Sequence, residues 1–156
     1  MRNPGLLSVL LGRWRHMLDT LGRLCTDGGS LVGVAYRLFE GSPRFITAVG
    51  LRFEAAAAVF RAVAADDTLA ASLGPLEPEP GETVVEVGRA APWSGCLGAG
   101  VCWAWQLTNQ QGYTDGVRLE FREPGGPSRA VVELVVVASA VQVFVAVAAD
   151  RGLVSE

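Results

Sequence analysis

The chain of 156 residues has no lysine and a single histidine, His16. Its thirteen strongly basic side chains are therefore all arginines, and they are dispersed along the sequence. With a net charge of −3, they form no basic cluster of the kind that a phosphate backbone requires. Nucleic-acid binding is therefore not expected. Alanine, valine and glycine are abundant too, a bias typical of a GC-rich genome, so the arginines by themselves indicate no function.

Cysteine is also scarce. Cys25, Cys96 and Cys102 are odd in number and contain no C-x-x-C pair, which argues against a disulfide framework and a structural zinc site. Cys102 lies in an apolar run, where a buried, unreactive thiol is expected. Because the chain has one histidine, most metal sites and Cys–His nucleophile schemes are excluded. We expect no cofactor and no bound metal.

Long hydrophobic runs are missing as well. Residues 5–12 are apolar, but the run is short, arginines follow it, and it lacks a small-residue cleavage pattern, so it does not predict a secretory signal. The most apolar stretch, residues 130–149, contains Glu133 and Gln142 and is rich in valine. It predicts a hairpin, or one long strand bent by a bulge, and not a membrane-spanning helix. A cytoplasmic location is the default expectation.

The N-terminal segment has the one clear helical pattern. Pro4 suits the start of a helix, residues 27–29 (Asp-Gly-Gly) suit its end, and apolar residues recur between them at three- and four-residue steps. We expect this stripe to pack on a sheet. Alternatively, the helix over residues 5–25 lies on a membrane surface, as Trp14 and the neighbouring arginines would allow. The stripe consists of Leu7, Leu10, Leu11, Trp14, Met17, Leu18, Leu21 and Cys25.

After Gly29 the apolar period changes to two, which is typical of strands. Residues 55–65 are ambiguous between helix and strand, and we favour a strand. Residues 74–82 combine three prolines with three glutamates and predict an exposed acidic loop. The fold class is therefore α+β: a helix within 1–28 packed on an antiparallel sheet of about six or seven strands, built from hairpins in 29–150. The other predicted strands are 31–39, 45–53, 83–88, 100–107 and 117–122.

The polar segment NQQGYTD, residues 109–115, joins two alternating runs and predicts a hairpin loop. Counting back from Val117 in steps of two places Asp115 and Tyr113 on the apolar side, which we take to be the side of the tryptophans. Either loop N–H groups satisfy the inward Asp115 carboxylate, or it lines a shallow pocket with aromatic walls. The candidate binding residues are Trp103, Trp105, Asn109, Gln111, Tyr113 and Asp115.

A second candidate site is the pair Asp66 and Asp67. With Asp115 they could hold Mg²⁺ or Ca²⁺ through oxygen ligands, as in a metal-dependent hydrolase. The alternative is that Asp66 starts a turn or caps a short helix over residues 68–73. The glycines of residues 95–100 lack the strand and helix context of a phosphate-binding loop and predict a flexible connector.

The order of these features resembles a small, uncharacterised bacterial family known as a domain of unknown function. The likeness covers about residues 24–148, and its most specific part is the W-x-W…N-x-x-G-Y-x-D run from Trp103 to Asp115. Residues 31–36, 51–53 and 66–68 also contribute. The resemblance implies no activity, although its members are similar in size and style to immunity proteins that neutralise toxins.

We therefore expect a small soluble protein that binds a partner protein and is not an enzyme. Missing catalytic constellations, together with aromatic residues and acidic loops, motivate this expectation. The alternatives are a hydrolase or small-ligand enzyme using Asp66, Asp67 and Asp115, and a membrane-peripheral protein attached through helix 5–25.

Overall fold

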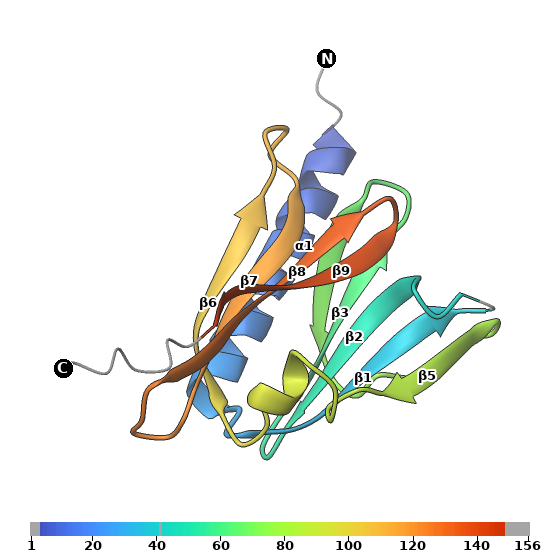
Figure 1. The fold of residues 1–156 in the computed structure, drawn as a ribbon. Helices are drawn as coiled ribbons and strands as arrows, with labels where there is room; N and C mark the ends of the chain where they lie inside the picture. Colours follow the sequence, from blue (N-terminus) through green and yellow to red (C-terminus); the bar gives the residue numbers. More distant parts are fainter. Residues whose placement is uncertain (1–3, 41, 149–156) are drawn as a thin grey trace.

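The structure, a computed structural model, describes residues 4–40 and 42–148 and folds them into one helix and two antiparallel sheets (Figure 1). The five-stranded sheet has the order β4-β3-β2-β1-β5, and the four-stranded sheet has the order β6-β7-β8-β9. The elements are α1 (Pro4–Asp27), β1 (Leu31–Phe39), β2 (Ile46–Phe53), β3 (Ala57–Val63), β4 (Thr68–Leu73), β5 (Glu82–Glu86), the 3-10 helix η1 (Trp93–Gly95), β6 (Gly100–Thr108), β7 (Thr114–Arg122), β8 (Ser128–Val137) and β9 (Ala140–Ala148).

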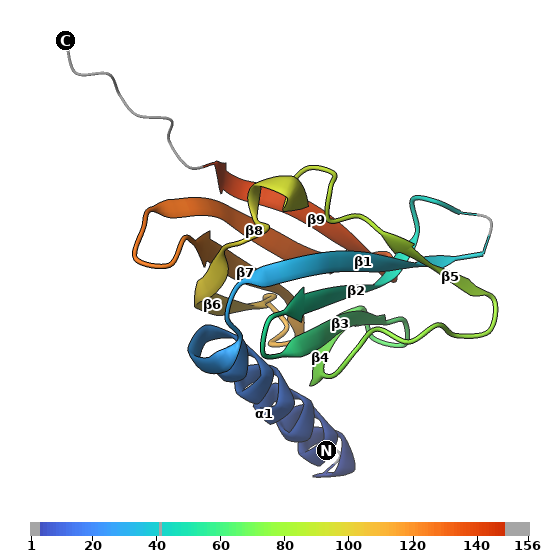
Figure 2. The same cartoon turned by 90° about the horizontal axis from the view of Figure 1, so that it is seen from below.

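The α+β class with an N-terminal helix is confirmed, but the expected single sheet of six or seven strands is wrong. The chain passes to a second sheet after β5, through a connection that contains η1. The two sheets then pack face to face, with β2 against β9 and β4 against β7. Their facing sides alternate apolar residues inward, so a shared core forms between them (Figure 2). Its fully buried residues include Val34, Val49, Leu51, Phe60, Val117, Leu119, Phe121, Val132 and Leu134.

Helix α1 closes one side of this sandwich, where it contacts the edge strands β4 and β6. Met17, Leu21 and Leu24 are buried there. The predicted stripe is only partly buried, however, because Leu11, Trp14 and Leu18 are 52%, 48% and 41% exposed. The side chains of Leu7 and Leu10 lie outside the described part of the structure. The C-terminal half of the helix therefore anchors it, and the N-terminal half presents apolar side chains.

Trp93, from η1, is buried between the two sheets. Its ring meets that of Phe121 edge to face, with centroids 6.2 Å apart and planes at 86°. Its indole Nε1–H donates a 2.6 Å hydrogen bond to the Tyr36 hydroxyl on β1. One side chain thus joins a strand of each sheet and keeps its only polar atom satisfied.

The β4–β5 connection crosses the outer face of the five-stranded sheet, because these two strands are at opposite edges of it. Leu76 lies so close to Gly50 that a Cβ there would be 2.6 Å from the Leu76 Cβ. Arg37, with a side chain only 9% exposed, pairs with Glu82 at 2.6 Å and with Glu79 at 3.3 Å. The predicted acidic loop is therefore a cover for this sheet, held by a buried arginine.

Several local predictions have clear outcomes. The strand favoured within 55–65 is confirmed as β3, and residues 68–73 form strand β4 and not a short helix. Residues 130–149 contain the hairpin β8–β9, whose turn places Ala138 and Ser139 at φ of 50° and 66°. The connector over 95–100 is packed on β1, where Leu31 exchanges backbone hydrogen bonds with Gly98 and Ala99. Its flexibility stays a prediction.

We expect Trp93→Ala to lower the free energy of unfolding by about 3–5 kcal/mol, because it empties a buried aromatic site. Trp103→Ala is the matched control: this tryptophan is 60% exposed, and its loss should change stability by less than about 0.5 kcal/mol. Urea denaturation followed by circular dichroism measures both. Equal losses in the two variants would contradict this packing.

Candidate functional site

The predicted hairpin over residues 100–122 is confirmed as β6 and β7, but the faces of its strands differ from the prediction. Trp103 pairs with Glu120, and Trp105 pairs with Arg118. Directly paired residues of antiparallel strands point to the same face, so both indoles lie with the charged residues on the outer face. The inner face carries Ala104 and Gln106 beside buried Leu119 and Val117. Trp103 and Trp105 therefore do not line an inward pocket with Asp115.

The outer face of the four-stranded sheet forms an aromatic surface, which we call the tryptophan face. One row of paired residues crosses it: Trp105, Arg118, Glu133 and Phe144. Arg118 Nε donates a 2.8 Å hydrogen bond to Glu133 Oε1, which neutralises both charges near the middle of the row. Trp103 is 60% exposed, Trp105 42% and Phe144 49%. The surface therefore combines exposed aromatic side chains with an ion pair whose two charges balance.

The loop over residues 109–113 owes much of its polarity to its turn. Asn109 Oδ1 accepts hydrogen bonds from the backbone N–H groups of Gln111 at 3.0 Å and Tyr113 at 3.2 Å. Gly112 has a φ of 85°, which a residue without Cβ adopts readily. Asn109 is therefore a turn-forming residue, while the Gln111 side chain is exposed. Ligand binding by these two residues stays a prediction.

Asp115 lies at a β-bulge, because Leu107 pairs with Gly116 while Thr108 pairs with Thr114. The extra residue breaks the two-residue alternation, so counting back from Val117 does not predict its direction. Asp115 is half-exposed, and within the described residues its carboxylate has neither a hydrogen bond nor an ion pair. The expected burial beside the tryptophans is therefore wrong.

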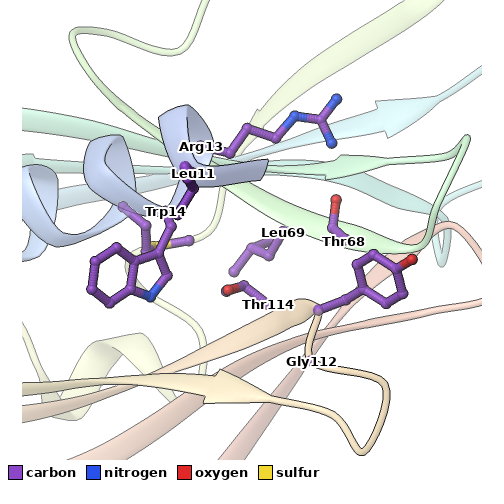
Figure 3. Close-up of a pocket in the computed structure, with 9 residues that line it drawn as sticks. Leu11, Arg13, Trp14, Thr68, Leu69, Gly112 and Thr114 are labelled. Carbon is purple, nitrogen blue, oxygen red and sulfur yellow. The ribbon is translucent and has the colours of Figure 1, made fainter. Parts of the chain in front are cut away.

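A cavity of about 340 Å³ lies where helix α1, strand β4 and the β6–β7 loop meet (Figure 3). Its floor contains Met17 and Leu69, which are 1% and 3% exposed, and its outer wall contains Leu11 and Trp14. The polar loop does contribute to a cavity, but the opposite wall is the helix and not the tryptophan pair. The rest of the lining is Arg13, Thr68, Gly112, Tyr113 and Thr114.

Asp66 and Asp67 are engaged by the protein itself. The Asp66 carboxylate accepts a 2.8 Å hydrogen bond from Arg13 Nη1 and others from the hydroxyl and the N–H of Thr68. Asp67 Oδ1 accepts a 2.8 Å bond from the N–H of Ser139, which ties the β3–β4 turn to the β8–β9 turn. Within residues 4–40 and 42–148, no His, Cys, Asp or Glu group is placed to hold a metal ion. These contacts favour a structural role.

The three thiols are poorly suited to nucleophilic chemistry. Burial raises the pKa of Cys96 to about 11. Burial raises the pKa of Cys25 and Cys102 as well; Cys102 adds to the rise at Cys25, and Glu120 adds to the rise at Cys102. All three are therefore protonated at neutral pH, where the thiolate would be the reactive form. The fully buried thiol is Cys96, whereas Cys102, expected to be buried, is half-exposed.

Phe144 and the Arg118–Glu133 pair of the tryptophan face, and Leu69 in the cavity, were not predicted as site residues. The alternation of Arg118, Glu120 and Arg122 marked an outer face, but only the strand pairing brings the tryptophans and Phe144 onto it. To predict Leu69 as a cavity residue, one would have to know that residues 68–73 form a strand.

We expect Asp66→Asn to destabilise the protein in a pH-dependent way. Partial burial raises the pKa of Asp66, but hydrogen bonds from Thr68 and Arg13 outweigh it and hold the pKa below the ordinary 3.8. The ionised carboxylate thus stabilises the fold above about pH 4, and this contribution disappears as the pH falls through the lowered pKa. The stability gap between wild type and Asp66→Asn should narrow between pH 5 and about pH 2, as measured by urea denaturation. A gap independent of pH would contradict the ion pair.

No curated protein and no solved structure matches the chain. In the part that the structure describes, no helix is long and apolar enough to cross a membrane. The model of a family of unknown function (DUF6334) matches residues 17–150, which is most of the chain. The protein therefore belongs to this family of unknown function.

Proposed function

We propose that this protein is a non-enzymatic binding module that recognises a partner protein through the tryptophan face. The observation that carries the proposal is that three exposed aromatic side chains share one sheet face: neighbouring Trp103 and Trp105 on β6, and Phe144 on β9 across the Arg118–Glu133 pair. Exposed hydrophobic residues scattered singly are normal, whereas grouped ones mark interaction sites. Tryptophan and arginine are the residues most enriched among those that dominate binding energy.

The contrast between the two sheets supports the choice of surface. The outer side of the five-stranded sheet is partly covered by the chain's own acidic loop, which Arg37 holds in place. The tryptophan face has no such cover among the described residues. Its ion pair is already formed, so a partner would desolvate a neutral pair and not an isolated charge.

A protein partner fits this surface better than a charged small molecule. Small ligands bury most of their area in enclosing cavities, whereas Trp103, Trp105 and Phe144 line none of the five cavities identified among the described residues. Charges of both signs lie near the indoles: Arg118 and Arg122 against Glu120 and Glu133. A neutraliser of another protein, of the immunity type, is the class of function that this arrangement suits.

The test is the double variant Trp103→Ala/Trp105→Ala, with Val32→Ala/Phe39→Ala as the matched control. The control removes two side chains on β1 that are each 55% exposed. Partners retained by the tagged wild type are quantified by mass spectrometry, and the Kd of the most enriched one is measured. We expect the double variant to lose at least about 2 kcal/mol, roughly a 30-fold rise in Kd, and the control to bind as wild type does.

Equal retention of the partner by both double variants would contradict the proposal. Sedimentation of the purified protein adds a second criterion. If wild type self-associates and Trp103→Ala/Trp105→Ala abolishes this association, the tryptophan face joins copies of this chain, and the proposed foreign partner is wrong. Circular dichroism of each variant confirms that the fold is retained.

A further inference from the structure

The cavity between the helix and the β6–β7 loop has the size and construction of a small-molecule site. Its volume of about 340 Å³ lies in the range of about 300–1,000 Å³ that is typical of ligand pockets. Figure 3 shows Leu69 between the helix and Thr114, with the Trp14 indole at the near wall. Buried residues of two elements, Met17 on α1 and Leu69 on β4, form the floor, so the cavity reaches the core and is not a surface dimple.

The charges around this cavity cancel within the protein. Arg13 is the cationic residue of the lining, and its Nη1 is paired with Asp66 at 2.8 Å. Figure 3 shows the Arg13 guanidinium directed away from the Trp14 indole. A carboxylate ligand at Arg13 would approach the Asp66 carboxylate, and a cationic ligand would compete with Arg13 for it. Either charge would be desolvated without a free counter-ion, so the lining selects an uncharged ligand.

Two of the three hydroxyl groups of the lining, those of Thr68 and Thr114, form hydrogen bonds within the protein. Thr68 donates to Asp66, and Thr114 accepts from Gln106 Nε2. Neither the Trp14 indole N–H nor the Tyr113 hydroxyl has a hydrogen-bond partner among the described residues. Both residues line the cavity. A ligand that satisfies one of these donors must carry an acceptor such as a carbonyl oxygen.

We infer that this cavity binds an uncharged, ring-containing small molecule with one carbonyl-type acceptor, held by Trp14 or Tyr113. The ring system packs on Leu11, Met17 and Leu69, and the acceptor takes the free donor. This site is separate from the tryptophan face and does not depend on the protein-binding proposal. It lies on the other side of the β6–β7 hairpin and uses none of the exposed aromatic residues of that face.

The test compares three naphthalene probes by equilibrium dialysis at pH 7: neutral 1-acetylnaphthalene, anionic 1-naphthaleneacetic acid and cationic 1-naphthylmethylamine. Wild type should bind the ketone saturably, one per chain, and each charged probe at least about tenfold more weakly. Leu11→Glu places a charge on the cavity wall and should weaken ketone binding about tenfold or more. Leu18→Glu is the matched control, because Leu18 is 41% exposed on the same helix but outside the lining; it should bind as wild type does.

A second pair of variants tests the acceptor. Trp14→Phe or Tyr113→Phe should weaken binding of 1-acetylnaphthalene while leaving binding of 1-ethylnaphthalene, which has no acceptor, unchanged. The inference is overturned if the ketone does not bind saturably, if a charged probe binds as tightly, or if Leu11→Glu has no effect. Flotation with phosphatidylcholine vesicles tests whether the apolar surface of the helix contacts a membrane instead. The inference is also overturned if wild type floats with the vesicles, both Leu11→Glu and Leu18→Glu abolish this flotation, and the two variants weaken ketone binding equally.

Discussion

Strands β4 and β5 form opposite edges of one sheet, and the chain between them has to cross that sheet. The crossing depends on Arg37, whose buried guanidinium pairs with Glu82 and Glu79 and donates to the Glu77 carbonyl. A buried guanidinium is stable only when it is paired, so the loop and the arginine require each other. Because this loop lies over Gly50, strand β2 is covered on both faces, and Ala48 is fully buried on the outer side. One outer face of the sandwich is thereby partly covered by the chain itself.

Two other parts of the sandwich are also held together by single elements. Helix α1 closes the side formed by β4 and β6, and Trp93 joins β1 to the facing sheet through Tyr36 and Phe121. Two of the regions that stay open are the tryptophan face and the N-terminal half of the helix. These two regions differ in chemistry: the first is flat, aromatic and neutral through an ion pair, and the second borders a cavity. We propose a partner protein for the first and a small uncharged ligand for the second.

Periodicity in the sequence predicts the helix and the hairpins, because these depend on local alternation. It leaves residues 55–65 ambiguous between helix and strand, and the favoured strand is confirmed as β3. It does not predict which face of β6 is buried. Trp103 and Trp105 are large and apolar, and an inward direction was the natural expectation. The register shifts between Val101 and Trp103 and between Leu107 and Thr108 determine which face of β6 is buried. No local sequence pattern indicates these shifts. The division into two sheets and the cover over β2 also depend on long-range pairing, which a single sequence does not encode in its pattern.

We propose that the tryptophan face is the recognition surface, and labelling of the four tryptophans tests this directly. Oxidative labelling of the free protein should modify Trp103, Trp14 and Trp105, which are 60%, 48% and 42% exposed, and spare Trp93, which is fully buried. Repeated with the bound partner, labelling of Trp103 and Trp105 should fall sharply while labelling of Trp14 persists. Protection of Trp14 with continued labelling of Trp103 and Trp105 would place the interface on the helix and contradict this account.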